Sequence, residues 1–373
     1  MAAVKKNGFR SRRPLNIFMK NHSALTICSV DYDSKKFLDL NWRLTRRLNE
    51  TGEFKWLVVD NNPADSDKRL DRNDKRFHVI NGVPHSSIIH CFACSAHHAA
   101  GLKKALPHIN TRFVLFLDPD YYIVRDRWID EIMAHMRCKG LSFFGAPWHP
   151  AWFVKYRYFP SAHCLFVDLD KVNIETLDFR PDHFNVLGCV DKAVREGKAS
   201  CSAAINNRGC WKRRKLSTLL LKVPLANRLI NIGKEKDTGY FIFRKYGRNP
   251  LFRRGCLVPA FNPKEALGKR KEREFIVSWR NRLVERFLPD RLCYAPKRKG
   301  YYSKSGFHDL GYFDANALGW EEFLYRGRPF GFHLRSMPKV MRDVDRYDQL
   351  SDLERAVEFF MKKINYKEGV SLR

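Results

Sequence analysis

The chain has 373 residues, of which 44% are hydrophobic and 13% aromatic, and this composition excludes a disordered or fibrous protein. Lysine and arginine total 69 against 40 acidic residues, so the formal net charge is +29, which favours polyanionic partners such as anionic membranes, phosphorylated substrates or nucleic acid. We see no run of about 18 apolar residues in the sequence and therefore expect no transmembrane helix.

The N-terminal residues and the cysteines bear on where the protein resides. Residues 1–22 are basic and lack the apolar stretch of a secretory signal, so we expect a basic tail. The ten cysteines do not have the spacing of a small disulfide-linked domain, which favours a reducing compartment. We expect a cytoplasmic protein, with peripheral binding of its basic surface to the inner face of the cytoplasmic membrane as a further expectation.

Strands and helices are expected to alternate from residue 24 onward. Apolar runs at 24–30 and 54–60 predict two strands, and the helix expected between them at 33–50 has leucines at helical spacing. A short strand at 78–83 and a helix at 87–106 follow. This succession is typical of the first half of a parallel α/β sheet.

The next elements continue the alternation. Residues 113–117 form an unbroken apolar run, which predicts a strand buried on both faces, and another strand is expected at 164–169. An amphipathic helix is expected at 350–364. The order predicts an α/β fold with a mostly parallel central sheet flanked by helices, formed by residues 23–250 and followed by a basic C-terminal extension at 251–373.

Acidic residues stand at the carboxyl ends of three predicted strands. Ligands of open α/β sheets bind beyond these strand ends, so we expect the acids to gather at one edge of the sheet. The alternative is that each acid only forms a strand-end turn or caps a helix. The four acids are Asp31, Asp60, Asp118 and Asp120.

The Asp118-Pro119-Asp120 sequence directly follows the apolar run at 113–117. Two adjacent carboxylates repel each other unless a cation compensates them. Mg²⁺ is commonly held by one or two carboxylates together with substrate phosphates. The tripeptide therefore suits a site for a divalent metal and a diphosphate, although aspartate and proline are also ordinary turn residues.

Several segments in order resemble the GT-A glycosyltransferases, and in particular glycosyltransferase family 2. The resemblance covers roughly residues 24–250 and is strongest at 99–132. It implies a GT-A (Rossmann-like) domain at 23–250, a UDP- or GDP-sugar donor and a Mn²⁺ or Mg²⁺ cofactor. The segments are LTICSVDYD, WLVVDNNPADSD, AAGLKKALPHINTRFVLFLDPDYYIVRDRWIDEI and KEKDTGYFIFRKYG.

The resemblance also implies roles for the strand-end acids. Asp31, Asp60 and Asp118 match nucleotide-contacting positions, and Asp118 and Asp120 match the D-x-D metal motif. His333 resembles a late histidine that completes the metal shell in some GT-A enzymes, although a lone histidine among aromatic residues is more often packed in a core.

Two acids are candidates for the catalytic base. The family places an acidic pair near a later turn, and this chain has Glu235 and Asp237 there. Either carboxylate could deprotonate an acceptor hydroxyl, and the alternative is an acid that pairs with a neighbouring lysine. The family's Arg-Asn pair before the helix glycine is replaced here by His97-His98, which puts that phosphate or ribose contact in doubt.

The aromatic segment at 145–163 lies where the family forms its donor and acceptor pocket. Trp148 and Trp152 could stack on sugar rings, and His149 or His163 could donate hydrogen bonds, while core packing is the alternative for each. The extension at 251–373 would complete the active site and the acceptor region.

The function that follows is metal-dependent sugar transfer from a nucleotide-sugar to a lipid-linked, lipopolysaccharide-type or capsule-type glycan, with inversion of configuration implied by the family. The alternative is a non-catalytic protein on a degenerate transferase fold that binds a membrane surface or nucleic acid. The basic segment at 210–231 could lie on anionic lipid. Nucleic-acid binding is not expected, because the sequence contains no recognised nucleic-acid-binding motif.

Overall fold

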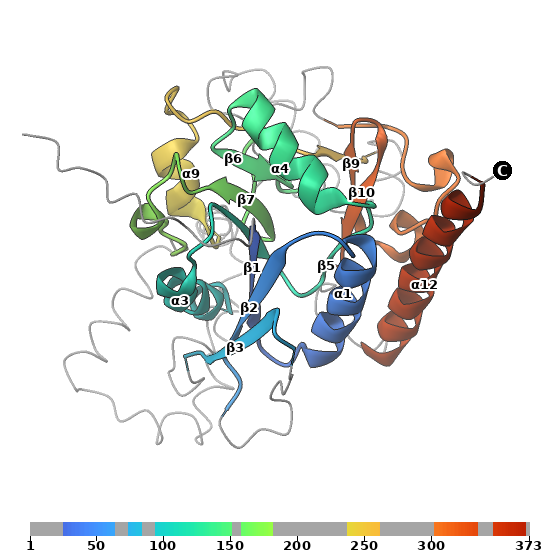
Figure 1. Cartoon of the computed structure of the whole chain (residues 1–373), viewed down its shortest axis with the longest axis horizontal. Helices are drawn as coiled ribbons and strands as arrows, with labels where there is room; N and C mark the ends of the chain where they lie inside the picture. Colours follow the sequence, from blue (N-terminus) through green and yellow to red (C-terminus); the bar gives the residue numbers. More distant parts are fainter. Residues whose placement is uncertain are drawn as a thin grey trace, which may run out of the picture.

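The computed structural model describes residues 25–63, 74–83, 94–150, 158–181, 237–261, 302–334 and 346–370. Its main sheet has six strands in the order β3-β2-β1-β4-β7-β6. Four of these strands are parallel to one another: β1 (Leu25–Asp31), β2 (Phe54–Asp60), β3 (Phe77–Asn81) and β4 (Phe113–Leu117). The strand β7 (Cys164–Asp168) runs antiparallel to both β4 and β6 (Phe143–Gly145). The expected α/β fold with a mostly parallel central sheet is confirmed (Figure 1).

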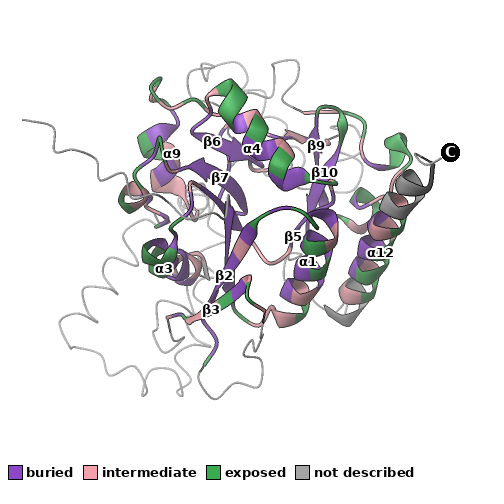
Figure 2. Ribbon diagram, in the orientation of Figure 1, coloured by how far each residue is buried: buried purple, intermediate pink, exposed green. Residues whose placement is uncertain are grey.

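Both faces of the main sheet are buried, as Figure 2 shows for its central strands. In β4, Phe113, Leu115 and Leu117 belong to one apolar core, and Val114 and Phe116 belong to a second core on the opposite face. The first core is covered by α1 (Lys35–Leu48) and α4 (Trp128–Lys139), and the second by α3 (Cys94–Ala105) and α9 (Tyr240–Tyr246). The unbroken apolar run of β4 thus reflects burial from both sides.

A second, antiparallel sheet has four strands in the order β5-β10-β9-β8. β5 (Tyr121–Ile123) follows the Asp118-Pro119-Asp120 turn, whereas β8 (Val258–Pro259), β9 (Glu321–Tyr325) and β10 (Arg328–His333) come from the last third of the chain. The sheet therefore joins the D-x-D segment to residues more than 200 positions away. The sequence pattern predicted none of β8, β9 and β10.

The C-terminal helix α12 (Arg346–Val370) lies beside α1, as Figure 1 shows. Leu353, Val357 and Phe360 are buried in the first core, in agreement with the predicted apolar stripe. Among the described residues, no helix is both long enough and apolar enough to cross a membrane. Short 3₁₀ helices occupy Leu106–His108, Ile174–Thr176, His308–Leu310 and Asn316–Leu318.

A buried acid on β9 anchors the loop that precedes this strand. Glu322 accepts hydrogen bonds from the backbone N–H groups of Phe307 at 2.7 Å and Asn316 at 3.1 Å. Gly306 leaves room for this carboxylate, because a β-carbon there would lie 2.6 Å from a Glu322 oxygen and the side chain would have to shift. Burial raises the pKa of Glu322 to about 7, although these backbone donors lower it in part.

The Glu322→Gln variant is expected to change how stability depends on pH. The folded protein holds the Glu322 proton more tightly than the unfolded chain, so this contribution is fully present below pH 4.5 and is lost as the pH rises to about 7. The stability of the wild type relative to Glu322→Gln should fall by up to about 3 kcal/mol across that range. Urea unfolding at several pH values measures this, and a constant difference would contradict it.

Candidate metal and nucleotide site

The Asp118-Pro119-Asp120 turn lies at the carboxyl edge of the main sheet, between β4 and β5. The Asp118 N–H donates to the carbonyl of His163 at 3.0 Å, and the Tyr121 N–H donates to the carbonyl of Asp118 at 3.0 Å. Both carboxylate-bearing residues are partly exposed, although the strands on either side of them are buried. The turn thus projects two acids from a rigid base.

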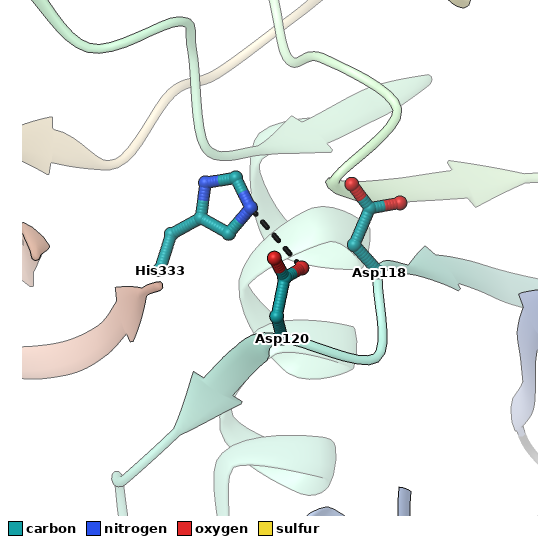
Figure 3. Close-up of side chains that lie close together, drawn as sticks. All are labelled: Asp118, Asp120 and His333. Carbon is teal, nitrogen blue, oxygen red and sulfur yellow. Dashed lines mark ion pairs between the residues drawn. The ribbon is translucent and has the colours of Figure 1, made fainter. Parts of the chain in front are cut away.

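His333 reaches the same place from the end of β10. It lies opposite Tyr121 in the antiparallel pairing of β10 with β5, and the Leu334 N–H donates to the carbonyl of Asp120 at 2.9 Å. One ligand atom from each of Asp118, Asp120 and His333 lies within 4.8 Å of the other two. Figure 3 shows the imidazole facing Asp120, with Asp118 on the other side of the turn.

These three side chains fit a divalent metal ion. An octahedral ion with bonds of about 2.1 Å places neighbouring ligand atoms about 3 Å apart, which small side-chain rotations reach from the observed spacing. Carboxylate oxygens suit Mg²⁺ and Mn²⁺, and a neutral imidazole is a further ligand for transition metals. Asp118 and Asp120 are partly exposed, so an ion held by them would be accessible to a substrate phosphate from the solvent side.

The His333 imidazole is held on both of its nitrogens. Nε2 lies 3.3 Å from Asp120 Oδ1, and Nδ1 lies 3.2 Å from Glu321 Oε2. Its ring stacks on that of His163, with centroids 4.7 Å apart and an interplanar angle of 14°. Burial lowers the pKa of His333, but the charges and hydrogen bonds of Asp120 and Glu321 outweigh it and raise the pKa to about 9.

His98 contacts the D-x-D turn, although no site role was expected for it. Its Nε2 lies 3.3 Å from Asp118 Oδ1. The neighbouring His97 is buried and donates from Nε2 to the Val83 carbonyl at 2.8 Å. The two adjacent histidines therefore differ: the His97 side chain contacts the backbone of Val83, and His98 lies at the candidate metal site.

Asp31 and Asp60 lie side by side at the same edge, at paired positions of β1 and β2. The Asn62 amide bridges them, because Nδ2 lies 2.9 Å from both Asp31 Oδ2 and Asp60 Oδ1. Asp31 also accepts hydrogen bonds from the backbone and side chain of Ser34 at the start of α1. Burial raises the pKa of Asp31, and the hydrogen bonds from Ser34 and Asn62 offset this in part.

The strand-end turn alternative for Asp31 is thus visible in these contacts, because Ser34 precedes the first residue of α1. The use of Asp31 and Asp60 as nucleotide ligands stays a prediction. Both side chains are almost fully buried, with exposed fractions of 0% and 3%.

The Asn62→Ala variant is expected to destabilise the fold by about 2–4 kcal/mol, because it removes a donor shared by two buried carboxylates. Asn316→Ala, an exposed substitution in the short 3₁₀ helix Asn316–Leu318, should cost less than about 0.5 kcal/mol. Denaturant titration of both variants measures the difference. Equal stability of the two variants would show that the amide bridge contributes little.

A small pocket, partly open to solvent, lies between the segment around Ser161 and the start of α9. Aromatic rings and Asp237 line it. Asp237 Oδ1 accepts a hydrogen bond from the Thr238 N–H at 2.8 Å. Ser161 connects the pocket to the metal site, since its hydroxyl contacts the His163 ring that stacks on His333. The lining residues are Trp148, Phe159, Pro160, Ser161, Asp237, Thr238, Gly239, Tyr240 and Phe243.

The other residues expected at the active site or in the donor and acceptor pocket have different surroundings. His149 donates from Nε2 to the Ala260 carbonyl at 2.8 Å and packs against Phe261, so it has a structural contact. His163 is buried beside Tyr121 and His333. Glu235 and Trp152 lie outside the described residues, as do 1–22 and 210–231.

Comparison with known proteins gives matches among solved structures only. No protein-family model and no curated protein matches the sequence. The galactosyltransferase LgtC, in complex with donor and acceptor sugar analogues, is 15% identical with a TM-score of 0.31, over 41% of this chain and 62% of that chain. The mannosyltransferase PcManGT from Pyrobaculum calidifontis, with GDP-Man and Mn²⁺, is 10% identical with a TM-score of 0.31, over 57% and 84%.

The glycosyltransferase GlyE of Streptococcus pneumoniae TIGR4 is 9% identical with a TM-score of 0.36, over 93% of this chain and 64% of that chain. The chain thus spans less than two thirds of the length of LgtC and of GlyE. Similarities as low as these do not define the function of this chain.

Proposed function

We propose that this protein is a metal-dependent GT-A glycosyltransferase that uses a nucleotide-sugar donor. The observation that carries the proposal is the meeting of Asp118, Asp120 and His333 at the carboxyl edge of a mostly parallel sheet. Ligands of such sheets bind beyond this edge. The resemblance of residues 24–250 to glycosyltransferase family 2 supports the same class.

The nucleotide would bind along this edge, from the bridged pair Asp31 and Asp60 toward the D-x-D turn. These acids stand at the ends of β1, β2 and β4, which are neighbouring strands. Asp118, Asp120 and His333 would hold Mn²⁺ or Mg²⁺. Such an ion supplies Lewis-acid stabilisation of the nucleoside diphosphate as it leaves.

Asp237 is the proposed catalytic base of an inverting transfer. It lines the pocket with Trp148 and Ser161, and a base must lie within hydrogen-bond reach of the acceptor hydroxyl. Its carboxylate accepts the hydroxyl proton while the acceptor oxygen bonds to the anomeric carbon. The bond from that carbon to the diphosphate oxygen breaks at the same time. Glu235 remains the alternative base.

The proposed acceptor is a lipid-linked, lipopolysaccharide-type or capsule-type glycan. Two features support it: aromatic rings around the pocket offer faces on which sugars stack, and the net charge of +29 favours an anionic acceptor or membrane surface. Peripheral binding at the inner face of the cytoplasmic membrane belongs to the same proposal.

The test is a transfer assay with the full chain, Mn²⁺ and a panel of UDP- and GDP-sugars, with lipid-linked saccharides as acceptors. We expect one donor to release its nucleoside diphosphate, and one acceptor to gain the mass of a single sugar. Absence of nucleoside diphosphate release with every donor, in a protein that is folded and binds Mn²⁺, would contradict the transferase function.

A further inference from the structure

Glu321 is a buried acid that lies beside the candidate metal site without belonging to it. The pairing of β10 with β5 and β9 places Tyr121, His333 and Glu321 in one row across the second sheet. The next row contains Tyr122, Phe332 and Glu322, and successive residues of a strand point to opposite faces. Of the two adjacent acids on β9, Glu321 therefore faces His333, and Glu322 faces the loop before the strand.

The contact of Glu321 is with the nitrogen of His333 that points away from Asp120. Glu321 Oε2 lies 3.2 Å from Nδ1, while Nε2 lies 3.3 Å from Asp120 Oδ1. A carboxylate that accepts the Nδ1 hydrogen fixes the tautomer in which Nε2 has a free lone pair, and it also fixes the ring orientation. The His163 ring, stacked at 4.7 Å, restricts rotation of the imidazole from a third side.

Stability alone does not account for an acid at this position. Removing a carboxylate from water costs several kcal/mol, and buried charge pairs often stabilise a fold no better than apolar residues of similar volume. Glu321 is only 4% exposed, and Phe323 and Leu324 of the same strand are apolar core residues. An orienting role toward His333 explains why an acid stands in this strand.

We propose that Glu321 is the positioning residue of the metal site, which holds the His333 imidazole so that Nε2 is presented to the ion. The proposal rests on the proposed function, because it assumes that His333 is a metal ligand. Glu321 itself does not touch the metal, and its effect passes through the hydrogen bond to Nδ1. Partners of this kind typically change metal affinity 10- to 100-fold when they are replaced.

The test compares Mn²⁺ binding to the full-length wild type, Glu321→Gln, Glu321→Ala and the matched control Glu322→Gln. Electron paramagnetic resonance of free Mn²⁺ gives the affinity, and the ¹⁴N coupling in the pulsed spectrum reports imidazole coordination. We expect Glu321→Ala to bind Mn²⁺ about 10- to 100-fold more weakly and to lose the ¹⁴N signature. Glu321→Gln retains an acceptor oxygen and should lie between Glu321→Ala and the wild type.

The control separates orientation from general stability. Glu322→Gln should alter the unfolding midpoint while leaving Mn²⁺ affinity and the ¹⁴N coupling unchanged. Wild-type affinity and coupling in Glu321→Ala would overturn the positioning role while leaving the metal site intact. If the wild type binds no Mn²⁺, or if Asp120→Asn binds it equally well, the metal site itself is refuted, and the role of Glu321 with it.

Discussion

Replacing Asp120 with asparagine is expected to lower the rate of sugar transfer roughly 10³-fold or more. Asp120 lies between the other two candidate ligands and contacts His333 at 3.3 Å, so its loss removes a charge from the centre of the group. A bound divalent ion contributes several kcal/mol to such reactions, and each 1.4 kcal/mol corresponds to about a factor of ten in rate. Initial rates of nucleoside diphosphate release, at saturating donor, measure the effect.

The matched control for this variant is Asp126→Asn. Asp126 is exposed and follows β5 by three residues, so it has the same chemistry a short distance from the D-x-D turn. Its substitution should change the rate less than about twofold, because it removes no candidate ligand. Transfer by Asp120→Asn at the rate of Asp126→Asn would show that Asp120 does not support catalysis.

Replacing Gly145 with alanine is expected to have the largest effect on stability, a loss of about 3 kcal/mol or more. Gly145 has φ +149°, and a β-carbon there would lie 1.9 Å from the carbonyl oxygen of Cys164 on the neighbouring strand. That carbonyl also accepts the Ala146 N–H at 2.9 Å, so moving it disrupts the pairing of β6 with β7. Denaturant unfolding of the variant gives the free-energy change.

Gly327→Ala is the comparison for backbone strain without a clash. Gly327 has φ +70°, and nothing lies within 4 Å of a β-carbon built there, so alanine should cost only about 1–2 kcal/mol. If Gly145→Ala is no less stable than Gly327→Ala, the close contact with Cys164 is not a constraint on the fold.

The features that follow from local sequence were predictable. β1 and β2 are mostly apolar segments of ordinary strand length, and β4 is apolar throughout, as burial on both faces of a sheet requires. The gathering of acids follows equally directly, since neighbouring parallel strands end at one edge. The sequence was therefore enough to predict that Asp118 and Asp120 lie at the same edge of the sheet as Asp31 and Asp60.

The second sheet could not be predicted, because its pairings are long-range and its strands are short. β8 has two residues and β5 has three, which is too few for an alternating pattern to emerge. The position of His333 depends on pairing between strands more than 200 residues apart. The resemblance suggested this histidine, but only the register shows that it meets Asp120.

Two contacts at the site had only weak signals in the sequence. Glu321 and Glu322 are adjacent acids in an otherwise aromatic and aliphatic strand, and charges in such a strand point to buried partners. His98 lies on α3, and its approach to Asp118 depends on how that helix packs beside β1. Neither partner could be named before the elements were placed in space.

Binding of a nucleotide together with a metal ion can be measured from the thermal unfolding midpoint with UDP, GDP, CDP and dTDP, each with and without Mn²⁺, for the wild type and Asp120→Asn. A ligand that binds only the folded protein stabilises it by about 2.7 kcal/mol at one hundred times its dissociation constant. We expect a rise of several degrees with one nucleotide, only when Mn²⁺ is present and only in the wild type. No rise with any nucleotide, or the same rise without Mn²⁺ and in Asp120→Asn, would contradict a metal-dependent nucleotide site at Asp118, Asp120 and His333.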